Sequence, residues 1–348
     1  MSFQFDYSSF NRPRIRFAAL PTPLQPLHRF REAMGSDAPH ILIKRDDMTG
    51  AALGGNKARK LEFLLAEAIS TGADTVLTCG AAQSNHALQT AAVAGRYGLK
   101  VVCVLDGPEP AKPPSGNMLL HRIIGTRIVW CTLQEGETRK EQARRRTLTE
   151  EADAIRSQGG SPFVIPTGGS TAVGSLGYVL AVEEVLLQLR ESEFGEISAV
   201  YFPSGSGGTQ AGLQVGARRS AWTARMAGVD VDYIAPDSSG IRPYHRAVLN
   251  LTRETAQAAG MSNADGGFDY EDIELWSEYA GAAYGVSTPG GEEAIHLLAS
   301  TEGIFLDPVY SGKAFAAMID HIRQGAFSKN ETLLFWHTGG VAGLFAPH

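Results

Sequence analysis

Lys57 is the residue whose type and position offer the most chemistry in this sequence. A Gly-Gly pair at 54–55 ends a loop, and Asn56 is well suited to cap the helix that follows. Lys57 then shares the apolar stripe of Leu61 and Leu64 at helical spacing. Lysine is almost never fully buried without a specific reason, so a lysine on an inward-facing stripe suggests a functional role.

Burial would make Lys57 a nucleophile. Loss of solvation disfavours the ammonium and lowers the lysine pKa, which leaves an amine that can form an imine with an aldehyde. The alternative is structural, because the flexible stem of a lysine at a helix N-terminus can carry its charge out to solvent. The segment by itself leaves both interpretations open.

A glycine-rich turn between a predicted strand and a predicted helix forms the second motif. The apolar run 199–202 leads into Ser204-Gly205-Ser206-Gly207-Gly208-Thr209, and a helical pattern begins near Gln210. Such turns present several backbone N–H groups to one anion, although a tight turn without a ligand is the alternative. The motif matches neither a Walker loop nor a dinucleotide fingerprint. A buried lysine with a cradle for a single phosphate predicts pyridoxal 5'-phosphate rather than NAD or ATP.

Three polar residues, Ser84, Asn85 and His86, begin a predicted helix after the strand at 75–79. Backbone donors at such a helix start favour an anion, for example a substrate carboxylate. The alternatives are that Ser84 or Asn85 merely caps the helix and that His86 is a core histidine, which is the interpretation we favour for His86.

Tyr284 and Tyr310 lie near glycines and are candidates for acid–base catalysis or for stacking on a ring. Half-buried structural tyrosines would give the same pattern.

Thr338 follows the last predicted strand, where it is placed for a cofactor contact. The Asp46-Asp47 pair has no matching His or Glu cluster, so we interpret it as the solvated start of a loop and expect no metal.

Short apolar runs alternate with helical patterns along the chain, which predicts an α/β fold with parallel sheet and right-handed crossovers. Loops are expected at 106–117 and 258–270. Ligands in open parallel sheets bind beyond the carboxyl ends of the strands, where the motifs above fall. The predicted strands are 41–44, 75–79, 101–105, 127–131, 163–166, 199–202, 225–231 and 333–337, with helices including 61–68 and 172–189.

The amino-acid composition and net charge indicate which kind of molecule the protein can bind. The chain has 348 residues, 20% of them charged, and a net charge of −6, so it offers no broad basic surface to nucleic acid. A small-molecule substrate is favoured. The three cysteines lie in apolar stretches without the spacing of a disulfide framework, which favours a reducing compartment. No apolar leader or run of ~20 apolar residues is evident, so we expect a cytoplasmic protein without a membrane span.

The motifs together resemble a known family. The segments GGNKARKLEFLLAEA, AAQSNH, VIPTGGSTAVGSLGY, SGSGGTQAGL, DPVYSGKA and HTGG, in this order, are similar to the D-cysteine desulfhydrase and 1-aminocyclopropane-1-carboxylate deaminase family. The similarity runs from about Ala19 to the C-terminus. These are pyridoxal-phosphate enzymes of the tryptophan-synthase-β-like fold (fold type II), with two open twisted parallel-sheet lobes. The resemblance implies a large domain of residues 1–56 and 168–348, a small domain of residues 57–167 and a homodimer.

The resemblance also implies roles for individual residues. Lys57 forms the Schiff base, Asn85 bonds the phenolic oxygen of the cofactor, and Ser84 contacts the substrate carboxylate and assists proton transfer. The phosphate is held by Lys60 and by the backbone of Gly205, Ser206, Gly207, Gly208 and Thr209. Tyr310 stacks near the ring and Tyr284 faces the substrate. His86 is among the residues expected to contact the substrate.

Two positions near the ring nitrogen bear on the reaction. The ring-opening deaminases carry Glu immediately after the DPVY tyrosine, where this chain has Ser311, and an apolar residue where it has Thr338. A carboxylate keeps the pyridinium protonated, whereas a hydroxyl does not hold that proton. The weaker electron sink suffices for a good β-leaving group such as thiolate. We therefore expect α,β-elimination from D-cysteine, giving pyruvate, sulfide and ammonia.

Four alternatives stay open at this point. The family continues its Tyr-Gly segment with Pro-Asn, whereas this chain has Ser287-Thr288-Pro289, which leaves the leaving group in doubt and makes an L-cysteate sulfo-lyase the nearest alternative. A 1-aminocyclopropane-1-carboxylate deaminase is the second. Outside this reaction class, the chain could be a non-catalytic pyridoxal-phosphate-binding regulatory protein or a nucleotide-binding α/β protein.

Overall fold

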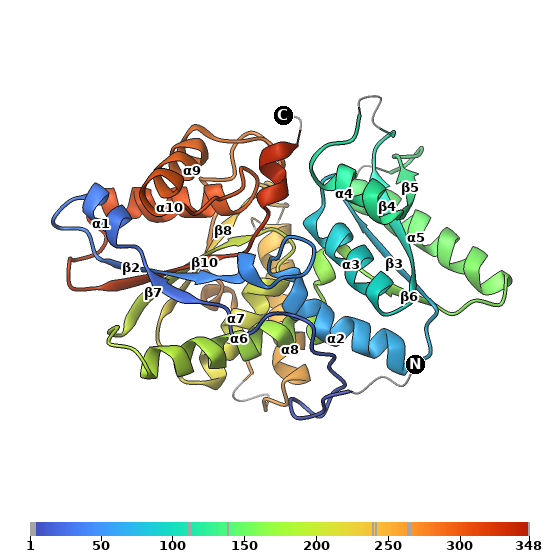
Figure 1. The fold of residues 1–348 in the computed structure, drawn as a ribbon, viewed down its shortest axis with the longest axis horizontal. Coiled ribbons are helices and arrows are strands. Elements are labelled where there is room, and N and C mark those ends of the chain that lie inside the picture. The colour runs from blue at the N-terminus through green and yellow to red at the C-terminus, as the bar shows by residue number, and fades with distance from the viewer. Residues whose placement is uncertain are drawn as a thin grey trace.

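The computed structural model describes residues 5–109, 113–137, 139–238, 240, 242–262 and 266–346. The predicted loops at 106–117 and 258–270 therefore lie partly outside the described residues. The described chain forms two separate sheets that lie side by side (Figure 1).

The larger sheet has six strands in the order β1-β2-β10-β7-β8-β9. The strand at one edge, β1, pairs antiparallel with β2, and every other neighbouring pair is parallel. The strands are β1 (Leu24–Pro26), β2 (His40–Arg45), β7 (Ile197–Ser204), β8 (Arg225–Asp230), β9 (Leu275–Trp276) and β10 (Thr332–His337).

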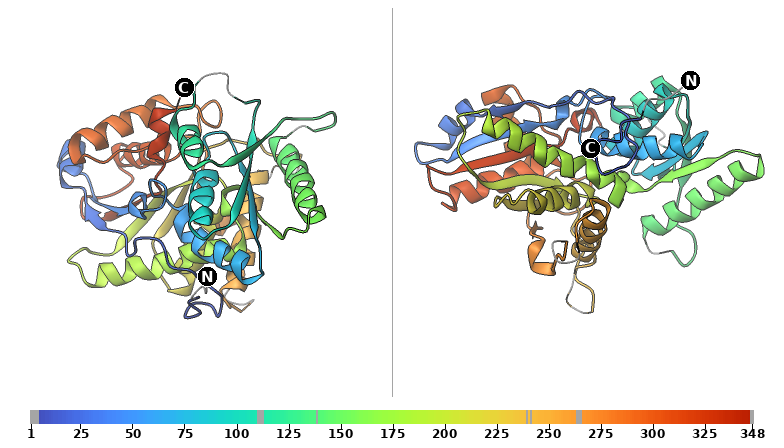
Figure 2. Two further views of the ribbon diagram at one scale, coloured as in Figure 1. Left: turned by 45° about the vertical axis from the view of Figure 1, so that its right-hand side comes forward. Right: turned by 90° about the horizontal axis from the view of Figure 1, so that it is seen from below.

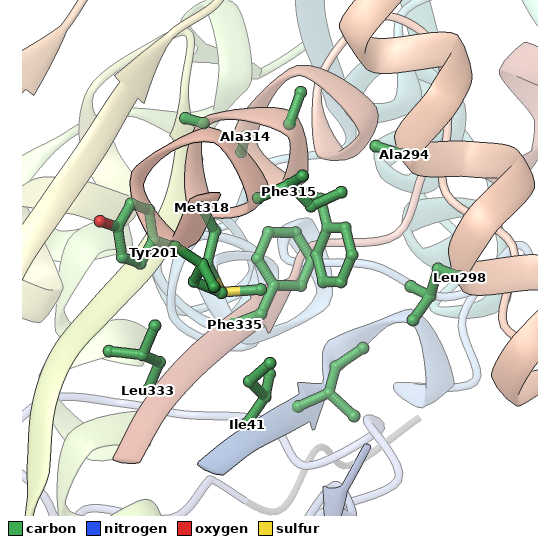
Figure 3. Close-up of a cluster of buried hydrophobic side chains, with 14 of the residues drawn as sticks. Ile41, Tyr201, Ala294, Leu298, Ala314, Phe315, Met318, Leu333 and Phe335 are labelled. Carbon is green, nitrogen blue, oxygen red and sulfur yellow. The ribbon is translucent and has the colours of Figure 1, made fainter. Parts of the chain in front are cut away.

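Helices cover both faces of the larger sheet (Figure 1). On one face lie α1 (His28–Met34), α9 (Pro289–Glu302) and α10 (Ser311–Arg323), and on the other lie α6 (Ala172–Arg190) and α7 (Gly208–Arg219), with α8 (Pro243–Ala258) packed against them. Figure 3 shows the hydrophobic core between the larger sheet and α1, α9 and α10. In this core Phe315 and Met318 of α10 contact Phe335 of β10. Strands covered on both faces are apolar on both, which explains why they appear in the sequence as continuous apolar runs.

The smaller sheet has four parallel strands in the order β5-β4-β3-β6. Figure 2 (left) shows α3 and α4 on one of its sides and α5 on the other. All six residues of β3, TVLTCG, are buried. The elements are α2 (Lys57–Ser70), β3 (Thr75–Gly80), α3 (Asn85–Arg96), β4 (Lys100–Asp106), α4 (Gly116–Ile124), β5 (Arg127–Cys131), α5 (Lys140–Ser157) and β6 (Pro162–Ile165).

The structure confirms the predicted α/β class, and each of the eight predicted strands overlaps an observed one. Two short strands, β1 and β9, were not predicted. All four strands of the smaller sheet fall within 57–167, and those of the larger sheet fall outside that range. The exact domain limits of 1–56, 57–167 and 168–348 stay a prediction.

One expectation about membrane spans needs correction. By length and composition, α6 is apolar enough to cross a membrane, so the sequence does contain a run of that kind. In the structure α6 packs against α2, α7 and α8, and its Glu184 pairs with Lys44 and Arg59. A core helix of a large α/β protein needs the same apolar composition, so packing accounts for it.

Candidate active site

Lys57 is the first residue of α2, as the sequence predicted, and it is partly buried there. Within the described chain its amine has no ion-pair or hydrogen-bond partner, and desolvation lowers the pKa of Lys57 to about 8. A substantial fraction of this amine is therefore neutral near physiological pH. The nucleophilic interpretation of Lys57 is the one that this environment supports.

Asn56 is the N-cap residue of α2, as predicted, but its side chain makes no capping hydrogen bond. Its Nδ2 instead donates to Thr209 Oγ1 at 2.9 Å, and its backbone N–H donates to the Thr338 carbonyl at 3.0 Å. These two contacts bring the start of α2 against both the glycine-rich turn and the segment after β10.

Lys60 lies one turn further along α2 and is fully buried. Its ammonium reaches the Gly168 carbonyl at 3.2 Å and Ser170 Oγ at 3.3 Å, two neutral acceptors, and no carboxylate pairs with it among the described residues. Desolvation, and then the nearby charge of Lys57, hold the pKa of Lys60 well below its usual range. A buried lysine without a counter-ion is costly, and an anion beside it would restore its charged form.

The predicted phosphate cradle stands at the N-terminus of α7. Gly207 is the residue before the helix and has φ +81°, a conformation that glycine adopts readily. A Cβ on Gly208 would lie only 2.7 Å from Lys60 Nζ and from Ser170 Oγ, so glycine there lets the backbone approach the lysine. Backbone donors at a helix start and a buried ammonium thus converge on one place, which suits a single phosphate.

A second turn contributes to the cradle and was missed as a site. After β6, the segment 167–170 leads into α6, and Ser170 Oγ donates to Ser206 Oγ at 2.8 Å and accepts from the Gly208 N–H at 3.2 Å. Gly168 has φ +70°, and a Cβ there would lie 2.1 Å from Ser206 Oγ. The signal was present, since Thr-Gly-Gly-Ser follows a predicted strand and precedes a predicted helix.

The three polar residues at the start of α3, Ser84, Asn85 and His86, have different local roles in the structure. Ser84 is the N-cap, and its hydroxyl accepts from the Ala87 N–H at 3.2 Å, so the capping interpretation is confirmed for Ser84. Asn85 is the first helical residue. His86 is buried, with Nε2 at 2.9 Å from Thr78 Oγ1, the surroundings expected of a core histidine. Substrate contacts of all three stay predictions.

Tyr284 and Tyr310, far apart in the sequence, meet in the structure with their hydroxyls hydrogen bonded to each other. Tyr310 also borders the glycine-rich turn, since a Cβ on Gly205 would lie 3.4 Å from its ring. Desolvation and the neighbouring Tyr284 raise the pKa of Tyr310 well above its usual range. Tyr310 therefore holds its proton at physiological pH.

Ser311 is fully buried and is bound to Asp307, a residue that was not among the predicted site residues. Its hydroxyl donates to Asp307 Oδ1 at 2.6 Å and accepts from the Asp307 N–H at 2.8 Å. The same carboxylate accepts N–H bonds from Val309, Tyr310 and Ser311. This arrangement fixes the turn that carries Tyr310. The predicted contact of Ser311 and Thr338 with the ring nitrogen stays a prediction.

The Asp46-Asp47 pair is not a solvated loop start, because Asp46 is completely buried. Its carboxylate accepts hydrogen bonds from Arg59, Tyr178, Trp336 and Thr22. Only Asp47, which pairs with Arg45, is partly exposed. No group of three or more His, Cys, Asp or Glu side chains able to hold a metal occurs among the residues the structure describes.

The arrangement fits pyridoxal phosphate. The aldehyde needs a neutral lysine amine, which Lys57 offers, and the phosphate needs buried donors, which the cradle and Lys60 offer. The tyrosine pair and the starts of α2 and α3 surround the same region. Gln89 of α3 connects the last two, because its Nε2 donates to the Gly54 carbonyl at 3.0 Å.

Comparison with known proteins gives consistent matches. The sequence matches the pyridoxal-phosphate dependent enzyme family over residues 15–339. It is 42% identical over 341 residues to a D-cysteine desulfhydrase of Salmonella typhimurium, and the match covers 97% of this chain and 96% of that protein.

Two solved structures extend the comparison to three dimensions. A homologue of ACC deaminase has a TM-score of 0.82 and 36% identity, covering 96% of this chain and 94% of its own. A hydrogen sulfide-producing enzyme from Fusobacterium nucleatum has a TM-score of 0.62 and 16% identity, covering 92% and 96%, and shows a common fold. All these matches span nearly the whole chain and therefore include both sheets.

Proposed function

Because the chain belongs to the pyridoxal-phosphate dependent enzyme family, we propose that it catalyses α,β-elimination of D-cysteine. The reaction would convert D-cysteine and water to pyruvate, hydrogen sulfide and ammonia. The observation that carries the proposal is the Lys57 amine, with a pKa of about 8, beside a cradle for one phosphate. The 42% identical desulfhydrase supports the choice of substrate.

The cofactor would be held at its two ends. Lys57 is the amine for the aldehyde, and Lys60 with the backbone of 205–209 would bind the phosphate. Asn85 would donate to the phenolic oxygen, while Tyr310 would lie against the ring and Ser311 and Thr338 near its nitrogen. When bound, the cofactor supplies an electron sink for the charge left on the α-carbon after proton removal.

Different residues around the substrate α-carbon would accept its proton and contact the leaving group. The Lys57 amine, with a pKa of about 8, is partly neutral at physiological pH and would accept the α-proton of the substrate. Tyr310 holds its own proton and hydrogen bonds to Tyr284, so this pair would not act as a base and would instead offer a hydroxyl hydrogen bond to the leaving sulfur. The substrate carboxylate would dock at the α3 N-terminus beside Ser84 and Asn85.

Ser311 favours elimination over ring opening. Its hydroxyl is neutral and its proton is engaged by Asp307, so it offers no negative charge to keep a ring nitrogen protonated. A thiolate leaving group tolerates the weaker electron sink. The ACC deaminase homologue among the solved structures makes 1-aminocyclopropane-1-carboxylate the second substrate to test.

The first experiment uses the purified holoenzyme with D-cysteine, L-cysteine, L-cysteate and 1-aminocyclopropane-1-carboxylate. We expect pyruvate with equimolar sulfide from D-cysteine, and far slower turnover of the others. Pyruvate or 2-oxobutanoate from another substrate, with none from D-cysteine, would contradict the proposed substrate while leaving the cofactor chemistry intact.

The matched variants test the roles of the lysines. Lys57→Ala should lose the visible absorbance of the bound cofactor together with turnover, a loss of at least about 1,000-fold. Lys60→Ala should keep the covalent link but weaken cofactor affinity, since it removes a charge from the phosphate. Normal turnover by Lys57→Ala would overturn the mechanism.

The proposal also includes a cytoplasmic location and a homodimeric assembly. All three cysteines are buried free thiols, which supports action in the reducing cytoplasm. We propose a homodimer, as in the family that the sequence resembles. Light scattering of the purified protein would contradict this if the mass were that of one 37.2 kDa chain.

A further inference from the structure

Asn117, at the start of α4, lies directly against Asn85, at the start of α3. Asn117 is 1% exposed, and its Nδ2 donates two hydrogen bonds. One goes to the Gln83 carbonyl at 2.8 Å and the other to Asn85 Oδ1 at 2.7 Å. Asn117 was not among the residues that the sequence motifs singled out.

These two bonds fix the orientation of both side-chain amides. A backbone carbonyl only accepts hydrogen bonds, so the Asn117 atom that faces the Gln83 carbonyl must be nitrogen. The second hydrogen on that nitrogen requires an acceptor, which identifies the facing atom of Asn85 as oxygen. The Nδ2 of Asn85 therefore points away from Asn117, with its hydrogens available to another acceptor.

We propose that Asn117 is a positioning residue that holds the Asn85 amide with its donor toward the phenolic oxygen of the cofactor. This inference rests on the proposed function, because the contact between Asn85 and the cofactor is itself part of that proposal. Asn117 acts only through Asn85 and touches no reacting atom.

Local packing holds the start of α4 in place beside α3. The Asn117 N–H donates to Gln83 Oε1 at 2.8 Å, and Gln83 Nε2 donates to the Ser115 carbonyl at 3.1 Å. A Cβ on Gly116 would lie 2.6 Å from Gln83 Oε1, so glycine allows this close approach. Together with the bond from Asn117 Nδ2, these contacts connect the segment before α3 to the start of α4 through Gln83.

Stability alone does not explain Asn117. Its own Oδ1 is buried and has no hydrogen-bond partner among the described residues, an arrangement that weakens a fold. An apolar side chain of similar size would avoid the unpaired oxygen, but it would remove the donor to the Gln83 carbonyl and to Asn85 Oδ1. Of these two acceptors, Asn85 is the one whose amide orientation the bond sets.

Asn117→Asp is the sharpest test, because it keeps the shape and replaces the donor with acceptors. Asn85 would then turn its Nδ2 toward the introduced carboxylate and present Oδ1 to the cofactor. The phenolic oxygen would lose a donor and become more basic. We expect the pKa read from the absorbance of the bound cofactor to rise by roughly one unit and cofactor affinity to fall by about tenfold.

Both quantities are measured on the holoenzyme by titrating the cofactor absorbance with pH and with added pyridoxal phosphate. The variants are Asn117→Asp, Asn117→Ala, Asn85→Ala and Asn85→Ala with Asn117→Asp. Leu119→Ala, on the exposed side of α4, is the matched control, and melting curves establish that each variant folds. If Asn117→Asp does not fold, Asn117→Ala gives the same test through loss of the donor.

The expected result is a shift in both quantities for the Asn117 variants, no shift for Leu119→Ala, and a double variant that matches Asn85→Ala alone. Wild-type values for the Asn117 variants, or an Asn117 effect that persists without Asn85, would overturn the inference and leave the proposed function standing. A wild-type protein that binds no pyridoxal phosphate would overturn both.

Discussion

The lowered pKa of Lys57 makes a prediction about how the cofactor is captured. A free lysine amine has a pKa of 10.5, and the surroundings of Lys57 lower this to about 8. Only the neutral amine attacks an aldehyde, so the rate of capture should rise with pH up to about 8 and then level off. Stopped-flow absorbance of cofactor-free protein mixed with pyridoxal phosphate measures this rate.

Lys57→Ala is the control, since it should show no covalent capture at any pH. A rate that continues to rise toward pH 10.5 would mean that the Lys57 amine is not desolvated as the structure indicates. The pKa of Lys60 is lowered in the same direction, but the Lys60 amine contacts the Gly168 carbonyl and Ser170 Oγ, whereas no hydrogen bond to the Lys57 amine is found among the described residues.

Individual site residues were predictable where type and local position sufficed. Lys57, on an apolar helical stripe after two glycines, and the turn before α7 are local patterns, and both lie where the sequence placed them. Asp46 was misjudged because its partners Tyr178 and Trp336 are more than a hundred residues away. Asn117 was missed for a related reason, since only the fold brings α3 and α4 together.

At the scale of elements, α2 is held in place by a buried ionic network two residues beyond Lys57. The Arg59 guanidinium donates two hydrogen bonds to Asp46 and two to Glu184, all between 2.7 and 2.9 Å, and Lys44 also binds Glu184. The network joins β2 and α6 to the first turn of α2. Fixing that turn fixes the backbone that carries Lys57.

Removing one partner from this network should be strongly destabilising. Arg59→Met leaves the Asp46 and Glu184 carboxylates without their main cation, and we expect the free energy of unfolding to fall by about 3–5 kcal/mol. Tyr178→Phe, which removes one donor to Asp46, should cost about 1–2 kcal/mol and covers the case in which Arg59→Met does not fold.

Urea denaturation of cofactor-free protein measures these losses. Glu183→Gln is the matched control, because Glu183 neighbours Glu184 on α6 and forms an exposed pair with Arg219, worth less than about 1 kcal/mol. Equal effects of Glu183→Gln and Tyr178→Phe would contradict the importance of the buried network.

The elements that escaped the sequence analysis are short or carry weak patterns. β1 has three residues and ends in Pro26, and β9 has two, so neither shows the alternation or the apolar run that predicts a strand. Their pairing is determined by β2 and β8, which lie beside them. The longer strands of both sheets were predicted because burial on two faces leaves continuous apolar runs in the sequence.

At the scale of the whole molecule, the residues of the candidate site come from both sheets and their connections. Asn85 begins a helix that packs on the smaller sheet, the cradle and Tyr310 begin helices that pack on the larger one, and α2 contacts α3 and α6. A cofactor bound here would therefore connect elements of both sheets. No local sequence pattern could reveal this, because it depends on how the two sheets are placed.

A cofactor that binds only the folded protein stabilises it, so removing the cofactor should lower the stability of the whole protein. A ligand at about 100 times its dissociation constant stabilises the folded state by about 2.7 kcal/mol, which for a chain of this length is about 4 °C in melting temperature. We expect cofactor-free protein to melt lower by about this amount or more and to regain the difference on adding pyridoxal phosphate. Calorimetry of both forms tests this, with Lys60→Ala expected to regain less than wild type at the same cofactor concentration. Equal melting temperatures with and without cofactor would mean that the cofactor does not bind the folded protein at this site.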